Sequence, residues 1–171
     1  AQPAEREAGA AAGARRPRGP RDEEVRRELV GLAVADDPIG KSSTLAYQSE
    51  QSLVSAGIPI FYPANVHEVI PMGLQAFQLS RFSGLCVALK ITADTADSNA
   101  VVDLSSLRPK NLNLIQKESV HITKHEPALE REETLFTKRL PSAKNFIFEN
   151  KINKVIRPTE IKNLGIITVG K

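Results

Sequence analysis

Short apolar runs alternate with longer amphipathic stretches through the middle of the chain. The runs at 29–34, 58–62 and 85–91 are almost wholly apolar, which is typical of strands buried on both faces. The segments between them are long enough to contain crossover helices, and the first helix is predicted over 43–56. This order of elements predicts an α/β fold, in which a parallel sheet is covered by helices on both faces.

The strongest helix signal begins at Asn65. Asn65 and Glu68 have the spacing of a capping box, with Asn65 as the N-cap residue. Apolar positions then recur with helical periodicity, at Val66, Val69, Ile70, Gly73, Leu74 and Phe77. Pro71 removes one internal hydrogen bond, so we expect a kink there. Arg81 suits the C-terminal end, where the helix dipole favours a cation.

The pattern is weaker beyond residue 98. Residues 100–126 are expected to be extended, 128–150 predict a helix with a break at Pro141, and Leu164–Val169 is typical of another buried strand. We divide the chain into four parts: a non-globular segment (1–28), one α/β unit (29–105), a linker with a helical segment (106–160) and the first strand of a further domain (161–171).

Residues 1–28 have a different composition from the rest of the chain. Residues 1–29 contain seven arginines and no lysine, and Gly and Pro interrupt any helical pattern. With few apolar residues to bury, residues 1–28 are predicted to be disordered. A transit peptide is the alternative, but six acidic residues and scarce serine count against it.

Composition excludes several classes of function. The 23 basic and 20 acidic residues leave a net charge of only +3, and no basic stripe is interleaved with aromatic residues, so a nucleic-acid interface is not predicted. No uncharged apolar run approaches the roughly 20 residues that span a bilayer. We therefore expect no membrane or nucleic-acid partner. We also expect a cytoplasmic location.

Cysteine and histidine usage gives no metal site. Cys86 is the only cysteine, which excludes an intrachain disulfide and a cysteine-based zinc cluster, and its apolar surroundings predict a buried core thiol. His121 and His125 are four residues apart and Glu126 follows them, but nothing else nearby completes a coordination shell. His67 falls in the first turn of the Asn65 helix, where a capping or surface role is expected.

Ligands of open parallel sheets bind outside the carboxyl ends of the strands. That rule selects three loops, Asp36–Thr44, Pro63–Asn65 and Thr92–Ser98. The first leads into the predicted 43–56 helix, whose N-terminal N–H groups would favour an anion. We expect Lys41, Ser42 and Ser43 to bind a carboxylate or a polar ring, and a plain helix N-cap is the structural alternative.

Gly40-Lys41-Ser42 also matches the end of a phosphate-binding loop. That motif requires a glycine five positions before Gly40, where this chain has Ala35. Asp36 and Asp37 would in addition lie against the polyphosphate. A phosphate-binding protein is therefore the weaker hypothesis.

A series of short matches resembles the bacterial indolepyruvate ferredoxin oxidoreductases, which are thiamine-diphosphate-dependent 2-oxoacid oxidoreductases. The resemblance covers about residues 30–171. Its matches are Asp36-Asp37, Lys41-Ser42-Ser43-Thr44, Gln48-Ser49-Glu50, Ile58-Pro59, Gly73-Leu74, Leu79-Ser80-Arg81-Phe82-Ser83-Gly84, Leu89-Lys90, Glu130 to Leu140, Asn150 and Leu164-Gly-Ile-Ile-Thr-Val-Gly-Lys171.

The resemblance implies a partial, doubly wound parallel sheet of the thiamine-diphosphate-binding fold. Residues 29–105 would be the C-terminal half of a pyrimidine-binding domain, and 161–171 the first strand of the next domain. The resemblance places Asp36, Asp37 and Asn65 beside the cofactor. It makes the loop residues candidates to hold a 2-oxoacid: Lys41, Ser42, Ser43 and Thr44.

The family's activity is the oxidative decarboxylation of a 2-oxoacid to an acyl-CoA, with electrons passed through iron–sulfur clusters to ferredoxin. The resemblance thus implies thiamine diphosphate, magnesium and iron–sulfur clusters in a larger, homo-oligomeric parent enzyme, with coenzyme A, ferredoxin and the enzyme's remaining domains as partners. We expect this fragment alone to be inactive and to bind no cofactor tightly, because half a cofactor pocket cannot catalyse. A non-catalytic α/β binding module is the competing hypothesis.

Overall fold

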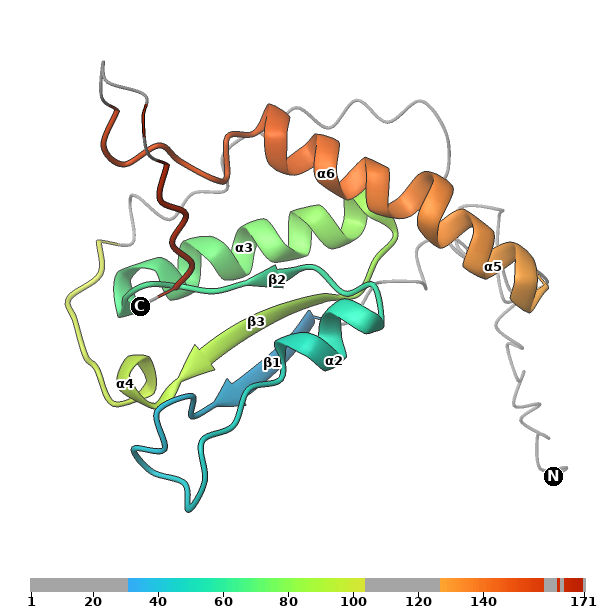
Figure 1. Ribbon diagram of the computed structural model, residues 1–171. Helices are drawn as coiled ribbons and strands as arrows, with labels where there is room; N and C mark the ends of the chain where they lie inside the picture. The colour runs from blue at the N-terminus through green and yellow to red at the C-terminus, as the bar shows by residue number, and fades with distance from the viewer. Residues whose placement is uncertain (1–30, 104–126, 159–162, 164, 171) are drawn as a thin grey trace, which may run out of the picture.

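The fold is mixed α/β, built on a small parallel sheet. The computed structural model describes residues 31–103, 127–158, 163 and 165–170. In this part of the chain three strands form the sheet in the order β1-β3-β2 (Figure 1): β1 Gly31–Asp36, β2 Ile60–Phe61 and β3 Val87–Thr92. The predicted parallel sheet is confirmed. All three strands begin about two residues later than predicted.

Helices lie on both sides of this sheet. Leu89 of β3 points toward α3, since a Cβ at Gly73 would lie 3.7 Å from it. The next residue, Lys90, points to the opposite side and contacts Glu50 of α2. The elements are α2 Glu50–Ser55, α3 Val66–Ser83, α4 Ala93–Ala96, α5 Ala128–Thr134, the π-helix η2 Leu135–Arg139 and α6 Leu140–Glu149.

The core lies between the sheet, α3 and α6. α6 packs along α3 (Figure 1), and the rings of Phe82 and Phe146 are 5.2 Å apart. The buried apolar cluster joins side chains from strands β2 and β3, helices α3 and α6, and the residue after the α3 turn: Phe61, Ala76, Leu79, Leu85, Val87, Ala143 and Phe146. The buried residues of α3 are Ala76, Leu79, Ser80 and Ser83, whereas Ile70 and Phe77 of the predicted apolar series are 45% and 55% exposed.

The predicted Asn65 helix is confirmed. Asn65 caps α3, its Oδ1 accepting the His67 N–H at 3.0 Å. Glu68 reaches one residue further back than a capping box requires and accepts the Ala64 N–H at 2.9 Å. The helix contains Pro71 and ends at Gly84, whose φ of 71° is the left-handed conformation that glycine adopts readily.

The helix predicted over 43–56 is wrong over its first half. α2 begins only at Glu50. The Ser42 and Ser43 N–H groups donate to the Asp37 carboxylate, and Tyr47 forms a bridge with Asp37. These bonds hold the backbone out of a helix, so the segment is a loop instead.

Two other predictions are corrected at the edges of the fold. β1 is an edge strand with Gly31, Ala33 and Ala35 exposed, rather than a strand buried on both faces. Residues 165–170 form no strand, because a strand requires a neighbour for its backbone hydrogen bonds and none of the described strands pairs with this segment. Predicted residues 1–28, 104–126 and Leu164 lie outside the described part.

The expected break at Pro141 takes another form. α5, η2 and α6 follow one another without interruption from Ala128 to Glu149. Pro141 cannot donate an N–H to Thr137, and a π-helical turn ends two residues before it, at Arg139. Among the described helices, none is long and apolar enough to cross a membrane.

Replacing Leu79 with alanine should destabilise the fold strongly. Leu79 is 0% exposed in the core, and Leu79→Ala should lower the free energy of unfolding by about 2–5 kcal/mol in urea titrations. Leu129, which is 81% exposed on α5, provides the matched control: Leu129→Ala should change it by less than about 0.5 kcal/mol. Equal effects of the two substitutions would show that the core is elsewhere.

Candidate functional site

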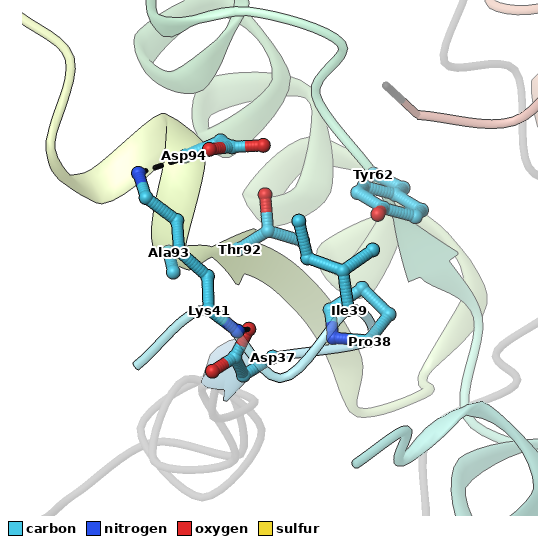
Figure 2. A pocket seen from close by; sticks show the side chains of 8 residues that line it. All are labelled: Asp37, Pro38, Ile39, Lys41, Tyr62, Thr92, Ala93 and Asp94. Carbon is cyan, nitrogen blue, oxygen red and sulfur yellow. Dashed lines mark hydrogen bonds and ion pairs between the residues drawn. The ribbon is translucent and has the colours of Figure 1, made fainter. Parts of the chain in front are cut away.

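A small open pocket lies at the carboxyl ends of the strands (Figure 2), the edge of the sheet that the sequence selects. The loop after β1, the end of β2 and the start of α4 all contribute to it. Its lining residues are Asp37, Pro38, Ile39, Lys41, Tyr62, Thr92, Ala93 and Asp94. The predicted loops Asp36–Thr44 and Thr92–Ser98 therefore converge. Between β2 and α3 it is Tyr62, just before the predicted Pro63–Asn65 segment, that reaches the pocket.

The loop after β1 folds around its own carboxylate. The two Asp37 carboxylate oxygens accept backbone N–H bonds from Lys41, Ser42 and Ser43 at 2.8, 2.6 and 2.7 Å. The Ser42 hydroxyl adds a longer bond of 3.2 Å. These bonds, led by the Ser42 N–H, lower the pKa of Asp37 to about 2. Asp37 thus occupies the position in which a phosphate-binding loop would hold its anion.

Lys41 joins this loop to α4. Its Nζ is 3.0 Å from Asp94 Oδ1 and 3.1 Å from Asp97 Oδ2, and Figure 2 shows it reaching across to Asp94. Hydrogen bonds to Asp94 and then Asp97 raise the pKa of Lys41, so it remains an ammonium. An ammonium has three donors, and the two carboxylates account for two of them. The half-exposed side chain can still offer the third to a ligand.

A buried ion cluster lies behind the pocket. Lys90, whose side chain is 1% exposed, places Nζ 3.1 Å from Asp36 Oδ2 and in contact with Glu50 Oε1. The ring of Tyr62 covers the same ammonium at 4.5 Å. Lys90 therefore links its own strand β3 to β1, α2 and the end of β2.

The pKa shifts in this cluster are set by competition between burial and pairing. Burial acts to lower the pKa of Lys90, but its bonds to Glu50 and Asp36 outweigh burial and raise that pKa. Burial likewise acts to raise the pKa of Asp36, yet the Ser49 N–H and hydroxyl, together with Lys90, lower it. Asp36 of β1 and Lys90 of β3 are thus both held in their ionised forms.

Two carboxylate oxygens in the cluster are buried without a hydrogen-bond partner. They are Asp36 Oδ1 and Glu50 Oε2. Two carboxyl groups share one ammonium, and the side chains of Lys90 and Asp36 are 1% and 0% exposed. Such an arrangement is costly to bury. It contributes a defined geometry more than it contributes stability.

Only some of the predicted site residues line the pocket. Asp37 and Lys41 line the pocket, whereas the Ser42 hydroxyl is bonded to Asp37. Ser43 and Thr44 are exposed on the loop. The remaining two predicted residues do not line the pocket: Asp36 lies in the buried cluster and Asn65 caps α3.

Two residues of this region, Tyr62 and Lys90, lie outside the loops that the sequence selects, whereas Thr92 and Asp94 lie in the predicted loop Thr92–Ser98. Tyr62 directly follows β2, so the strand-end rule could have selected it. Lys90 had a stronger signal, because a lysine within an apolar strand run must be paired with a carboxylate when it is buried. Its partners, 54 and 40 positions away in the sequence, could be identified only from the structure.

The described residues do not by themselves fit thiamine diphosphate with magnesium. No group of three or more His, Cys, Asp or Glu in the described part of the chain could hold a metal ion. The N–H groups of the loop are already bonded to the Asp37 carboxylate, so they are not free to cradle a diphosphate. We derive no catalytic step through this cofactor.

Cys86 and the predicted histidines add no reactive group to the pocket. Cys86 is partly rather than fully buried, and burial raises the pKa of its thiol, which therefore stays protonated. His121 and His125 lie outside the described residues. The chemistry that the pocket can perform is ligand binding, by the Lys41 ammonium, the Thr92 hydroxyl and the face of Tyr62.

Comparison with known proteins adds no relative: no protein-family model, curated protein or solved structure matches the chain.

Replacing Lys90 should show how strongly two carboxylates without a cation destabilise the fold. Lys90→Met leaves Asp36 and Glu50 without their cation and should lower the free energy of unfolding by about 3–5 kcal/mol. Adding Asp36→Asn and Glu50→Gln removes both charges and should recover part of that loss. The exposed Lys144→Met is the control and should differ from wild type by less than about 0.5 kcal/mol in the same urea titrations. A Lys90→Met protein as stable as this control would contradict the ion cluster.

The loop should lose its internal bonds only in strong acid. Because the folded pKa of Asp37 lies below its ordinary value of 3.8, the stabilisation is complete above that value and is lost as pH falls through about 2. The amide resonances of Ser42 and Ser43, followed by NMR, should titrate with that low midpoint. Asp37→Asn should abolish the titration. A midpoint near 3.8 in the wild-type protein would show that the carboxylate does not accept these N–H bonds.

Proposed function

We propose that the chain is a segment of a thiamine-diphosphate-dependent 2-oxoacid:ferredoxin oxidoreductase. In this proposal it is the C-terminal half of a pyrimidine-binding domain with a doubly wound parallel sheet, followed by a linker. The observation that supports the proposal is the pocket at the carboxyl ends of the strands. The loop that forms one wall of the pocket, residues 37–41, lies in the stretch with the sequence resemblance.

The role proposed for this chain is to bind the 2-oxoacid. The Lys41 ammonium stays charged through its bonds to Asp94 and Asp97, and its third donor would bond to the substrate carboxylate. Thr92 and Tyr62 line the same pocket and would contact the rest of the substrate. Because the loop N–H groups donate to the Asp37 carboxylate, Lys41 is the main cationic donor that remains for a ligand in this pocket.

The parent enzyme would perform the full reaction. The bond between the carboxyl and carbonyl carbons of the 2-oxoacid breaks and carbon dioxide leaves. The coenzyme A thiol releases its proton to solvent, its sulfur bonds to the carbonyl carbon, and the two electrons released pass through iron–sulfur clusters to ferredoxin. Thiamine diphosphate, when bound by the complete parent, supplies the carbanion stabilisation that this decarboxylation requires. A homo-oligomeric, cytoplasmic parent belongs to the same proposal.

Two experiments test this proposal at different levels. The DNA on both sides of the reading frame should continue in frame into a domain with clustered cysteines, and stop codons in every frame would contradict a larger parent. In that parent, Lys41→Ala should raise the KM for the 2-oxoacid about tenfold or more, because a charge-assisted bond is lost. The KM for coenzyme A should stay unchanged. Lys138→Ala, at an exposed site that does not line the pocket, is the control.

Titration of the isolated chain separates the alternatives. Calorimetry with thiamine diphosphate and magnesium, with a 2-oxoacid and with a nucleotide covers the three hypotheses. Saturable nucleotide binding that disappears in Lys41→Ala would favour the phosphate-binding protein and contradict our proposal. We place that alternative second, because Asp37 occupies the loop N–H groups that a phosphate would need.

A further inference from the structure

The loop between β1 and α2 presents three large apolar side chains to solvent. Ile39, Leu45 and Tyr47 are 72%, 78% and 60% exposed. The loop is closed at its base, where Asp36 accepts both the N–H and the hydroxyl of Ser49, at 3.0 and 2.8 Å. A loop held in this way loses little conformational entropy on binding, which favours its use as a docking surface.

The surroundings of these side chains are acidic. Asp94 lines the pocket, and Asp94 and Asp97 share the ammonium of Lys41. Two carboxylates against one ammonium give this group of exposed and partly exposed side chains a surplus of negative charge. We call this surface the strand-end face: Ile39, Leu45 and Tyr47 with Lys41, Asp94 and Asp97.

A second exposed apolar surface lies at the end of α6. Phe148, Val155 and Ile156 are 80%, 81% and 81% exposed. Exposed basic residues surround them, with one exposed acidic residue among them. We call this surface the basic face: Phe148, Val155 and Ile156 with Lys144, Glu149, Lys151, Lys154 and Arg157. In Figure 1 the end of α6 and the segment after it lie at the top of the view, whereas the loop after β1 lies at the bottom.

We propose that copies of this chain associate head to tail, with the basic face of one copy bound to the strand-end face of the next. Each face combines three exposed apolar side chains with a surplus of one charge, and the two charges have opposite signs. Electrostatic complementarity of this kind selects a partner and its orientation. Because the two faces are different surfaces of one chain, the contact is heterologous and leaves one face free at each end of the assembly.

This association would also complete the pocket. Ile39 belongs both to the strand-end face and to the pocket lining, so a docked basic face lies across the pocket's open side. Apolar side chains of a second copy would then contribute a wall that one chain lacks. The inference depends on the two faces alone and stands independently of the proposed function.

Sedimentation velocity of the full chain tests the proposal. Wild type should associate with increasing concentration at low salt, and less so at high salt. Leu45→Ser damages only the strand-end face and Phe148→Ser only the basic face, so each alone should weaken self-association by at least about tenfold. Leu129→Ser, equally exposed but outside both faces, should associate like wild type. Circular dichroism confirms that each variant is folded.

An equimolar mixture of the two defective variants is the decisive measurement. Each variant retains the face that the other has lost, so the mixture should form dimers and nothing larger. A mixture that stays monomeric, or a wild-type chain that is monomeric at every concentration, overturns the proposal. So does a monomeric chain that sediments with phosphatidylserine vesicles and loses that binding in Phe148→Ser, since the basic face would then bind lipid. None of these outcomes depends on the Lys41 or flanking-DNA results.

Discussion

The buried ammonium of Lys90 is the constraint on which the arrangement of this fold depends. It belongs to the central strand β3 and must find negative charge in a place without water. Asp36 at the end of β1, Glu50 at the start of α2 and the ring of Tyr62 after β2 provide it. Register makes this possible, because Lys90 pairs with Val34 and Thr92 with Asp36, which puts Asp36 diagonally beside Lys90 on one face. The strand ends are therefore held in one geometry, and the pocket is built on them.

The loop after β1 binds a carboxylate that belongs to the loop itself. Gly40-Lys41-Ser42 has the residues of a phosphate-binding loop, and its N–H groups do converge on negative charge. That charge is the neighbouring Asp37 carboxylate, which belongs to the chain itself. The lysine is consequently directed away from the loop, toward Asp94 and Asp97. The N–H groups of this motif do converge on an anion, but that anion is the side chain of the residue three positions before Gly40.

The failed predictions have one physical origin in common. Residues 43–49 were predicted as helix and Leu164–Val169 as strand because their side-chain patterns suit those elements. In the first segment the backbone N–H groups at its start donate to Asp37 instead of forming a helix. In the second, residues 165–170 have no strand to pair with among the described residues. β1 was predicted to be buried on both faces because its run is apolar, yet its place at the sheet edge exposes Ala33 and Ala35. Apolarity predicts that a segment forms a strand, but its neighbours decide how far that strand is covered.

The sequence by itself determined the α/β class, the parallel strands, the capped helix α3 and the edge of the sheet where a ligand would bind. These features follow from periodicity, capping residues and the handedness of crossovers, all of which act over short distances along the chain. Only the tertiary structure decided which groups share that edge. The partners of Lys90 and Lys41 lie between 40 and 56 residues away. Charge pairing between such distant positions leaves no periodic signal, since it depends on strand order and register rather than on local sequence.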